Sequence, residues 1–305
     1  MGKIAFVFAG QGAQYPGMGK DLYEQSAAAR YVFDMVEAER PGTLEQCFDG
    51  DKETLARTIN TQPCLFAVDL ACAKALVEKG VRPDMAAGFS LGELAAVAFA
   101  EMLPLRDATR LVCRRAELMD SCAVGQKTAM AAVLRLSAEQ VEKLCEDYDK
   151  VYPVNYNCPG QTVVSGEEGQ IASLSERAAA LKGRAVRLNV SGAFHSPYMH
   201  EAALGLGAYM QDLRFAQPIL PVYANCTAAP YSAEQAKDLL SRQVENPVRW
   251  EQIVREMIAQ GVDTFVECGA GKTLSGLISK IDKDVTVCRV ENAETLAQTL
   301  QALGR

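Results

Sequence analysis

The stretch Gly88-Phe89-Ser90-Leu91-Gly92 constrains this chain more than any other. A serine with a glycine two positions away on each side is typical of a tight strand-to-helix turn, where neighbouring backbone leaves no room for a β-carbon at the glycines. Apolar residues precede the turn, and the helix formers of residues 94–98 follow it. The turn would expose Ser90 Oγ at its tip, and the helix N-terminus would point at the place where an oxyanion forms. The pattern predicts a nucleophilic serine.

Length and composition limit the classes of protein that could carry such a turn. With 305 residues, 49% of them hydrophobic, the chain can form one large domain or a large domain with an insert. The net charge of −7 argues against a nucleic-acid partner, and no apolar run is long enough to span a membrane. Residues 4–8 are too few for the apolar part of a signal peptide. Ten cysteines without a C-x-x-C pair indicate a cytoplasmic location, and two histidines leave no zinc-type spacing, so no metal is expected.

The first predicted strand, residues 4–8, runs into Gly10-Gln11-Gly12, and two interpretations compete for this turn. A glycine, any residue and a glycine after a strand open a dinucleotide-binding fingerprint, but Tyr15 stands where its third glycine would fall. The alternative is a loop beside the serine turn, since hydrolase-like sites take one oxyanion amide from a neighbouring loop. In that interpretation, the backbone amide of Gln11 is the second oxyanion donor.

The remaining pattern predicts a large α/β domain interrupted by a small one. Residues 21–79 and 107–122 are predicted to be helical. Between residues 126 and 191, strand and helix patterns follow in the order βαββαβ, which is that of a ferredoxin-like unit. We therefore expect residues 1–125 and 192–305 to form the large domain with a parallel sheet, and residues 126–191 to form the far wall of a cleft over Ser90.

A serine nucleophile is usually activated by an imidazole, and the sequence offers only His195 and His200. His195 precedes the helix that Ser196-Pro197 begins, where the positive end of the helix dipole favours a neutral ring. His200 falls inside that helix, beside its apolar stripe. Position favours His195 as the base, with His200 as the alternative. Position does not choose among Arg110, Arg114 and Arg115 in the predicted helix 107–122.

Seven motifs in this order resemble those of malonyl-CoA:acyl-carrier-protein transacylases, nearly end to end. They are Gln11-Gly12-Ala13-Gln14, Gly88-Phe89-Ser90-Leu91-Gly92-Glu93, Arg115, Asn155-Tyr156-Asn157-Cys158-Pro159-Gly160-Gln161, Gly192-Ala193-Phe194-His195, Asn246-Pro247-Val248-Arg249-Trp250 and Glu267-Cys268-Gly269-Ala270-Gly271. The resemblance implies an α/β-hydrolase-like core with a ferredoxin-like insert, in agreement with the patterns above.

The resemblance also implies an activity: transfer of malonyl from malonyl-CoA to the phosphopantetheine thiol of an acyl carrier protein, for fatty-acid or polyketide synthesis. Ser90 would carry the malonyl group in ping-pong order, with His195 as base and the amides of Gln11 and Leu91 as the oxyanion hole. Arg115 would bind the free malonyl carboxylate through its two-pronged guanidinium. No cofactor is implied, because coenzyme A enters as part of a substrate.

Two further residues take roles from the resemblance. A Phe directly before the histidine, here Phe194, goes with malonyl in related acyltransferases, where a smaller residue goes with α-methyl-branched units. No carboxylate stands out as a third triad member, and the family orients its histidine through a backbone carbonyl, here that of Gln243. The residue before the serine, often His in this family, is Phe89, whose side chain we expect to pack beside the turn.

Two other functions stay open at this point. A serine hydrolase such as a thioesterase would share the serine turn and the base, but a hydrolase of neutral acyl chains has no use for a buried Arg115. A module that only binds carrier proteins would not need Ser90, His195 and Arg115 together.

Overall fold

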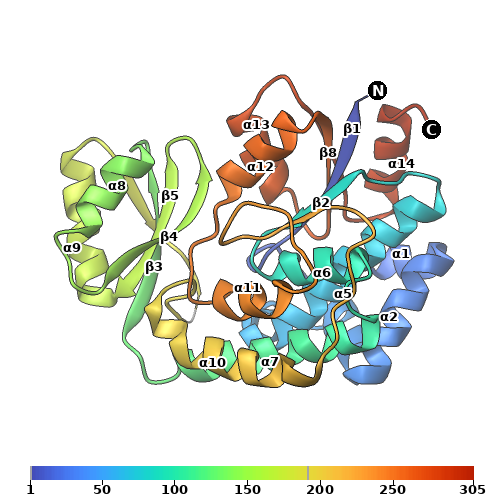
Figure 1. Ribbon diagram of the computed structural model, residues 1–305, viewed down its shortest axis with the longest axis horizontal. Coiled ribbons are helices and arrows are strands. Elements are labelled where there is room, and N and C mark those ends of the chain that lie inside the picture. The colour runs from blue at the N-terminus through green and yellow to red at the C-terminus, as the bar shows by residue number, and fades with distance from the viewer. Residues whose placement is uncertain (1, 191) are drawn as a thin grey trace.

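The computed structural model describes residues 2–190 and 192–305, which form two sheets with helices packed around them (Figure 1). The larger sheet belongs to the N- and C-terminal parts of the chain, and the smaller one to the middle part. The small sheet with α8 and α9 lies at one end of the molecule, and both termini lie at the other end. This layout agrees with the expected large α/β domain and its insert.

The larger sheet has the order β7-β2-β1-β8-β9, and all its strands are parallel. Its strands are β1 (Lys3–Phe8), β2 (Met85–Gly88), β7 (Val222–Tyr223), β8 (Val262–Cys268) and β9 (Thr286–Val290). Because the strands are parallel, their carboxyl ends meet at one edge, which is where α/β proteins place their ligands. The Ser90 turn follows β2 at that edge, and the Gln11 loop follows the neighbouring β1.

Helices cover both faces of this sheet because side chains of a strand point alternately to its two sides. Phe6 and Phe8 pack into one core with α2, α5 and α6, whereas Ala5 and Val7 pack into another with α12 and α13. The helices of this domain are α1 (Lys20–Gln25), α2 (Ala27–Glu39), α3 (Thr43–Phe48), α4 (Lys52–Ala56), α5 (Thr58–Glu78), α6 (Leu91–Phe99), α7 (Leu105–Ala123), α10 (His200–Tyr209), α11 (Ala236–Gln243), α12 (Trp250–Ala259), α13 (Thr273–Ile281) and α14 (Ala293–Ala302).

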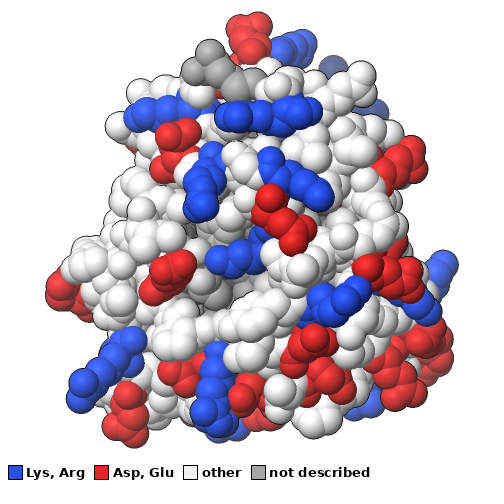
Figure 2. Space-filling view, turned by 90° about the vertical axis from the view of Figure 1, so that its right-hand side faces the viewer, with Lys and Arg blue, Asp and Glu red and all other residues white. Residues whose placement is uncertain are grey.

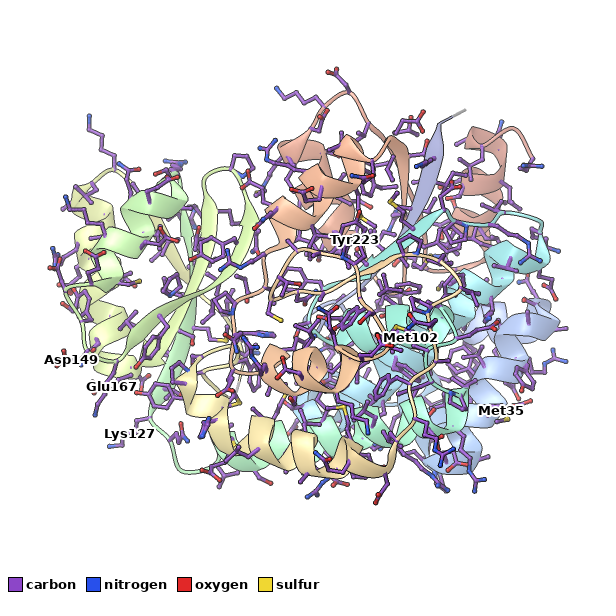
Figure 3. The ribbon with its side chains drawn as sticks, viewed as in Figure 1. Met35, Met102, Lys127, Asp149, Glu167 and Tyr223 are labelled. Atoms are coloured by element: carbon purple, nitrogen blue, oxygen red, sulfur yellow. The ribbon has the colours of Figure 1, made fainter. Side chains whose placement is uncertain are left out.

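The small sheet is antiparallel, with the order β4-β5-β3-β6. Its elements are β3 (Thr128–Leu134), α8 (Ala138–Cys145), β4 (Val151–Cys158), β5 (Gln161–Glu167), α9 (Glu168–Ala180) and β6 (Arg184–Arg187). The βαββαβ order is the one that the sequence predicts, and the Ser137 capping box opens α8 as expected. Lys127, Asp149 and Glu167 lie together at one end of this sheet (Figure 3).

Only one face of the small sheet is covered by its own helices. Ala131 and Val133 pack against α8 and α9, whereas Met130 and Ala132, which alternate with them, join the core of the large domain. The sheet thereby forms a wall over the Ser90 edge, as expected. The proposed boundaries after residues 125 and 191 fall outside the strands, and they stay a prediction because residue 191 lies outside the described residues.

Figure 2 views the large domain from the side away from the small sheet. Acidic and basic side chains are interspersed over this face, with several Lys and Arg around a hollow, so neither sign forms a continuous surface there. No helix in the described part of the chain is long and apolar enough to cross a membrane.

Asp69 is a fully buried carboxyl on α5, in contact with the backbone of Gly269 after β8. Neither of its oxygens has a hydrogen-bond partner within residues 2–190 and 192–305. Burial, followed by the charge of nearby Glu267, raises the pKa of Asp69 well above its ordinary value. The fold therefore favours a protonated, neutral Asp69.

We expect Asp69→Asn to abolish the fall in folding stability with rising pH that the raised pKa of Asp69 causes. Between the ordinary carboxyl pKa of about 4 and the raised value, the folded chain holds a proton that the unfolded chain releases. The stabilisation is complete below about pH 4 and is lost as pH rises, by up to about 1.4 kcal/mol per pH unit. Urea unfolding at several pH values should show the variant gaining stability relative to the wild type as pH rises. A difference that stays constant with pH would contradict this.

Candidate active site

The turn between β2 and α6 places Ser90 in a backbone conformation that few residues adopt, with φ 52° and ψ −104°. The two flanking glycines make this turn possible. A β-carbon on Gly88 would lie 1.9 Å from the carbonyl of Gly92, and one on Gly92 would lie 2.2 Å from the carbonyl oxygen of Phe8. Only residues without a β-carbon allow α6 to pack this closely against β1 and β2.

Asn225, two residues after β7, holds the turn from both sides. The backbone N–H of Ser90 donates to its Oδ1 at 2.7 Å, and its Nδ2 donates to the carbonyl of Gly88 at 2.6 Å. Unfavourable backbone conformations persist where the surroundings determine them from several directions. The two hydrogen bonds of Asn225 provide such a restraint.

His195 is the imidazole that the fold brings to Ser90. Its Nε2 lies 2.7 Å from Ser90 Oγ, and its Nδ1 lies 2.9 Å from the carbonyl of Gln243 and 3.2 Å from that of Asn246. Carbonyl oxygens only accept hydrogen bonds, so they place the proton of a neutral ring on Nδ1. Nε2 is then free to accept the proton of the Ser90 hydroxyl.

The two histidines differ in their electrostatic surroundings. Burial, followed by the charge of Arg115, lowers the pKa of His195 to about 4, although the Gln243 and Asn246 carbonyls oppose this shift. His200 is exposed, and its hydrogen bond with Glu245 raises its pKa. At neutral pH, His195 is therefore unprotonated, as a general base must be.

We expect NMR titration of the two imidazoles to separate them, with His195 protonating well below 6.5 and His200 above it. In Arg115→Ala, the removal of a nearby positive charge should raise the pKa of His195, because its protonated form is no longer repelled. His200 serves as the internal control and should not move. An unchanged His195 pKa in the variant would contradict the electrostatic influence of Arg115.

Arg115, on α7, is the buried one of the three arginines among which position in the helix did not choose. It donates to Gln62 Oε1 at 2.8 Å, to Gln243 Oε1 at 2.8 Å and to Ser90 Oγ at 3.1 Å. Its Nε is buried without a hydrogen-bond partner in the described part of the chain. Arg110 and Arg114 instead pair on the surface with glutamates. The guanidinium thus brings a positive charge to the serine, and its Nε remains an unused donor among the described residues.

The loop after β1 lies against the serine turn. The backbone N–H of Phe89 donates to the carbonyl of Phe8 at 3.0 Å, and a β-carbon on Gly10 would lie 2.7 Å from the carbonyl oxygen of Phe89. Gln11 follows directly, with its side chain bonded to Thr58. Leu91, on the other side of Ser90, is the first residue of α6, whose N-terminal amides have no partners within the helix.

A cavity of about 80 Å³ lies over Ser90 and His195. It adjoins a second cavity of about 230 Å³, with which it shares Gln11, Phe89, Asn155 and Leu188 as lining residues. Phe194 lines the smaller cavity and is buried. The ring of Phe89 packs against that of Trp250, 5.7 Å between centroids, beside the turn as expected. Both cavities are lined by residues of the large domain and of the small sheet.

Sequence reasoning missed several polar residues that contact the predicted ones. Glu93 carried a signal, since an acidic residue one turn into an otherwise apolar helix must be buried if that helix is buried. The others carried none, because they come from segments that only the fold brings close. They are Gln62, Asn225 and Tyr231. In residues 2–190 and 192–305, no three His, Cys, Asp or Glu side chains are arranged to hold a metal ion.

Comparison with known proteins agrees with this geometry. The acyl transferase domain family matches residues 5–294. The malonyl CoA-acyl carrier protein transacylase of Bacillus subtilis strain 168 is 39% identical over 311 residues, covering 99% of this chain and 98% of its own. The crystal structure of the Clostridium perfringens transacylase superposes with a TM-score of 0.95 at 36% identity, covering 99% and 97% of the two chains.

A third similar structure contains a partner. It is a malonyl-transacylase in complex with a type II polyketide synthase acyl-carrier protein, 32% identical with a TM-score of 0.94 over 98% of this chain and 99% of that one. The fold and the matches together define an enzyme of the acyltransferase class. The chain belongs to the acyl transferase domain family, among the malonyl CoA-acyl carrier protein transacylases.

Proposed function

We propose that this enzyme transfers a malonyl group from malonyl-CoA to the phosphopantetheine thiol of an acyl carrier protein through a malonyl ester of Ser90. The observation that carries this proposal is the position of Ser90 Oγ, 2.7 Å from a buried neutral imidazole and 3.1 Å from a buried guanidinium. The imidazole suits a base, and the guanidinium suits an acyl group that ends in a carboxylate.

In the first half of the reaction, Nε2 of His195 takes the proton of Ser90 as Oγ bonds to the thioester carbon. The carbonyl oxygen becomes an oxyanion, and the backbone amides of Gln11 and Leu91 donate to it. When the intermediate collapses, the carbon–sulfur bond breaks and the coenzyme A thiolate takes the proton from Nε2. The products are free coenzyme A, malonyl-Ser90 and a neutral His195.

The second half runs the same steps with the carrier protein's thiol. Its proton passes to Nε2 of His195 as sulfur bonds to the ester carbon, and Ser90 Oγ leaves and regains a proton from the imidazole. His195 is neutral at the beginning and end of each half, and the second half regenerates the free hydroxyl of Ser90. The protein's own side chains thus supply every proton transfer, and we propose that the reaction needs no cofactor.

Arg115 binds the free carboxylate of the malonyl group in this proposal. Its present acceptors, the side chains of Gln62, Gln243 and Ser90, are all neutral, and its Nε has no acceptor among the described residues. Burial lowers the pKa of Arg115 only to about 10, so the guanidinium stays charged at neutral pH. A carboxylate would satisfy Nε and neutralise the charge, whereas a neutral acetyl group would do neither.

The larger cavity fits the pantetheine arm that both thiol substrates share. Asn155 and Asn157 line it, and the side-chain oxygen of each is buried without a hydrogen-bond partner in the part of the chain that the structure describes. Unpaired amide oxygens need N–H donors, and a pantetheine arm carries two amides. We propose that these two asparagines accept hydrogen bonds from the arm as it reaches Ser90.

Two other functions are less well supported. A thioesterase for neutral acyl chains would leave the buried charge of Arg115 without a ligand, which is costly. A module that only binds carrier proteins would have no need for the aligned Ser90 and His195. We also propose a cytoplasmic location, supported by the ten cysteines, all of which are free.

Substitution of the serine and the histidines tests the covalent mechanism. Ser90→Ala should abolish the malonyl adduct seen by intact mass after malonyl-CoA is added without carrier protein, and should lower transfer by about 10⁴-fold. His195→Ala should lower adduct formation by about 10²- to 10⁴-fold, because the base is lost. His200→Ala, the matched control, should retain it. An adduct on Ser90→Ala, or greater loss in His200→Ala, would refute the assignment.

Substitution on either side of the substrate tests selectivity. Arg115→Ala should lower kcat/KM for malonyl-CoA by about 10²- to 10³-fold and relatively improve acetyl-CoA, because the buried ion pair is lost. Phe194→Ser should admit methylmalonyl-CoA, because the ring no longer fills the space beside the acyl α-carbon. Competition assays with the three thioesters measure both. An Arg115→Ala enzyme that kept its malonyl preference would exclude the carboxylate contact.

A further inference from the structure

Glu93 is a fully buried carboxyl that the proposed mechanism does not use. It lies on the first turn of α6, three residues after Ser90. Three donors from distant segments reach it. Tyr231 Oη donates to Oε1, whereas the backbone N–H of Asn225 and the side-chain Nε2 of Gln243 donate to Oε2 at 3.1 and 2.7 Å. Both oxygens of this carboxyl are therefore bonded by groups around the active site.

The bond to Gln243 fixes which way its side-chain amide points. The two donors on Nε2 are used by Glu93 Oε2 and by the carbonyl of Ser90, both at 2.7 Å. Oε1 must then point the other way, where it accepts from Arg115 at 2.8 Å. A reversed amide would turn its N–H groups toward the guanidinium, which would then lack an acceptor, and its oxygen toward Glu93 Oε2 and the Ser90 carbonyl, which would then lack a donor. Glu93, together with the Ser90 carbonyl, thus determines whether Arg115 meets the oxygen or the nitrogen of the Gln243 amide.

The bond to Asn225 connects the same carboxylate to the serine turn. Glu93 Oε2 holds the backbone of Asn225, whose side chain bonds to the backbone on both sides of the turn. Glu93 Oε2 therefore contributes both to the orientation of Arg115, through Gln243, and to the restraint on Ser90, through Asn225.

We propose that Glu93 is a positioning residue: Oε2 orients the Gln243 amide so that its oxygen fixes the Arg115 guanidinium, and in this way Glu93 sets the preference for malonyl over neutral acyl groups. The inference rests on the proposed function, since it assigns Arg115 to the malonyl carboxylate.

This role does not require Glu93 to be ionised. Burial raises the pKa of Glu93 to about 7, against the effects of Tyr231, Gln243, Asn225 and Arg115, which lower it. A proton on Oε1 would be donated to Tyr231, and Oε2 would still accept from Asn225 and Gln243. The hydrogen bond from Gln243 depends on the position of Glu93 Oε2 and not on the charge of Glu93. The proposal can therefore be separated from simple charge compensation of Arg115.

Two conservative variants make this separation. Glu93→Gln keeps an oxygen in the place of Oε2 and turns its NH₂ toward Tyr231, so it retains the position and removes the charge. Glu93→Asp retains the charge but is shorter by one methylene, about 1.5 Å, and withdraws the oxygen from Gln243. Tyr231→Phe is the matched control, since it removes only the donor to Oε1. Serine acylation is measured with malonyl-CoA and with acetyl-CoA, alongside thermal unfolding.

We expect the malonyl-to-acetyl ratio of acylation rates to stay within about threefold of the wild type in Glu93→Gln and in Tyr231→Phe, and to fall by about tenfold in Glu93→Asp. Gln243→Met, which removes the same acceptor from Arg115 with Glu93 in place, should lower the ratio similarly, and it serves if Glu93→Asp does not fold. The proposal is overturned if Glu93→Gln lowers the ratio and Glu93→Asp does not, or if Gln243→Met leaves it unchanged. Equal losses with both thioesters would show a merely structural role. A wild type that forms no malonyl adduct would instead refute the proposed function.

Discussion

The close approach of α6 to the end of β1 is the constraint on which the rest of the site depends. Gly92 lies against the carbonyl of Phe8 without room for a β-carbon, so the helix can begin only where the strand ends. Since β1 and β2 are parallel neighbours, this contact also brings the Gln11 loop beside Ser90. Ser90, the proposed oxyanion donors and the helix N-terminus are thus held together by backbone packing, which does not depend on side-chain conformation.

Polar groups buried behind the serine form one connected network, because none could be buried alone at low cost. Side-chain amides stabilise the charge of Arg115. Gln243 bonds to Arg115 through Oε1, to Glu93 through Nε2 and to His195 through its backbone carbonyl. Such a network sustains a charged group near a neutral base. It also couples the two, since the charge of Arg115 helps to keep His195 unprotonated.

The small sheet contributes the other half of the cleft through the face that its own helices leave uncovered. Met130 and Ala132 point toward the large domain, and Asn155 and Asn157 line the larger of the two cavities beside the serine turn. Alternation along antiparallel strands makes this possible, because one set of side chains forms the subdomain's core and the other faces the large domain. The wall over Ser90 is therefore a direct consequence of strand geometry.

The sequence by itself determined the elements and the turn that carries Ser90. Local rules act within a few residues, so the glycine-flanked turn, the βαββαβ order and the capping box at Ser137 could all be predicted, and the motif resemblance supplied the family. Helix position could not choose Arg115 over Arg110 and Arg114, because three arginines on one helix differ only in what packs against each face, and only the motif resemblance singled Arg115 out. Tertiary structure gives the physical reason, because it buries Arg115 beside Ser90 and leaves the other two on the surface. It also brought Gln62, Asn225, Tyr231 and Gln243 to the serine from four separate segments, because hydrogen bonds between distant residues depend on the packing of whole elements and leave no local pattern in the chain.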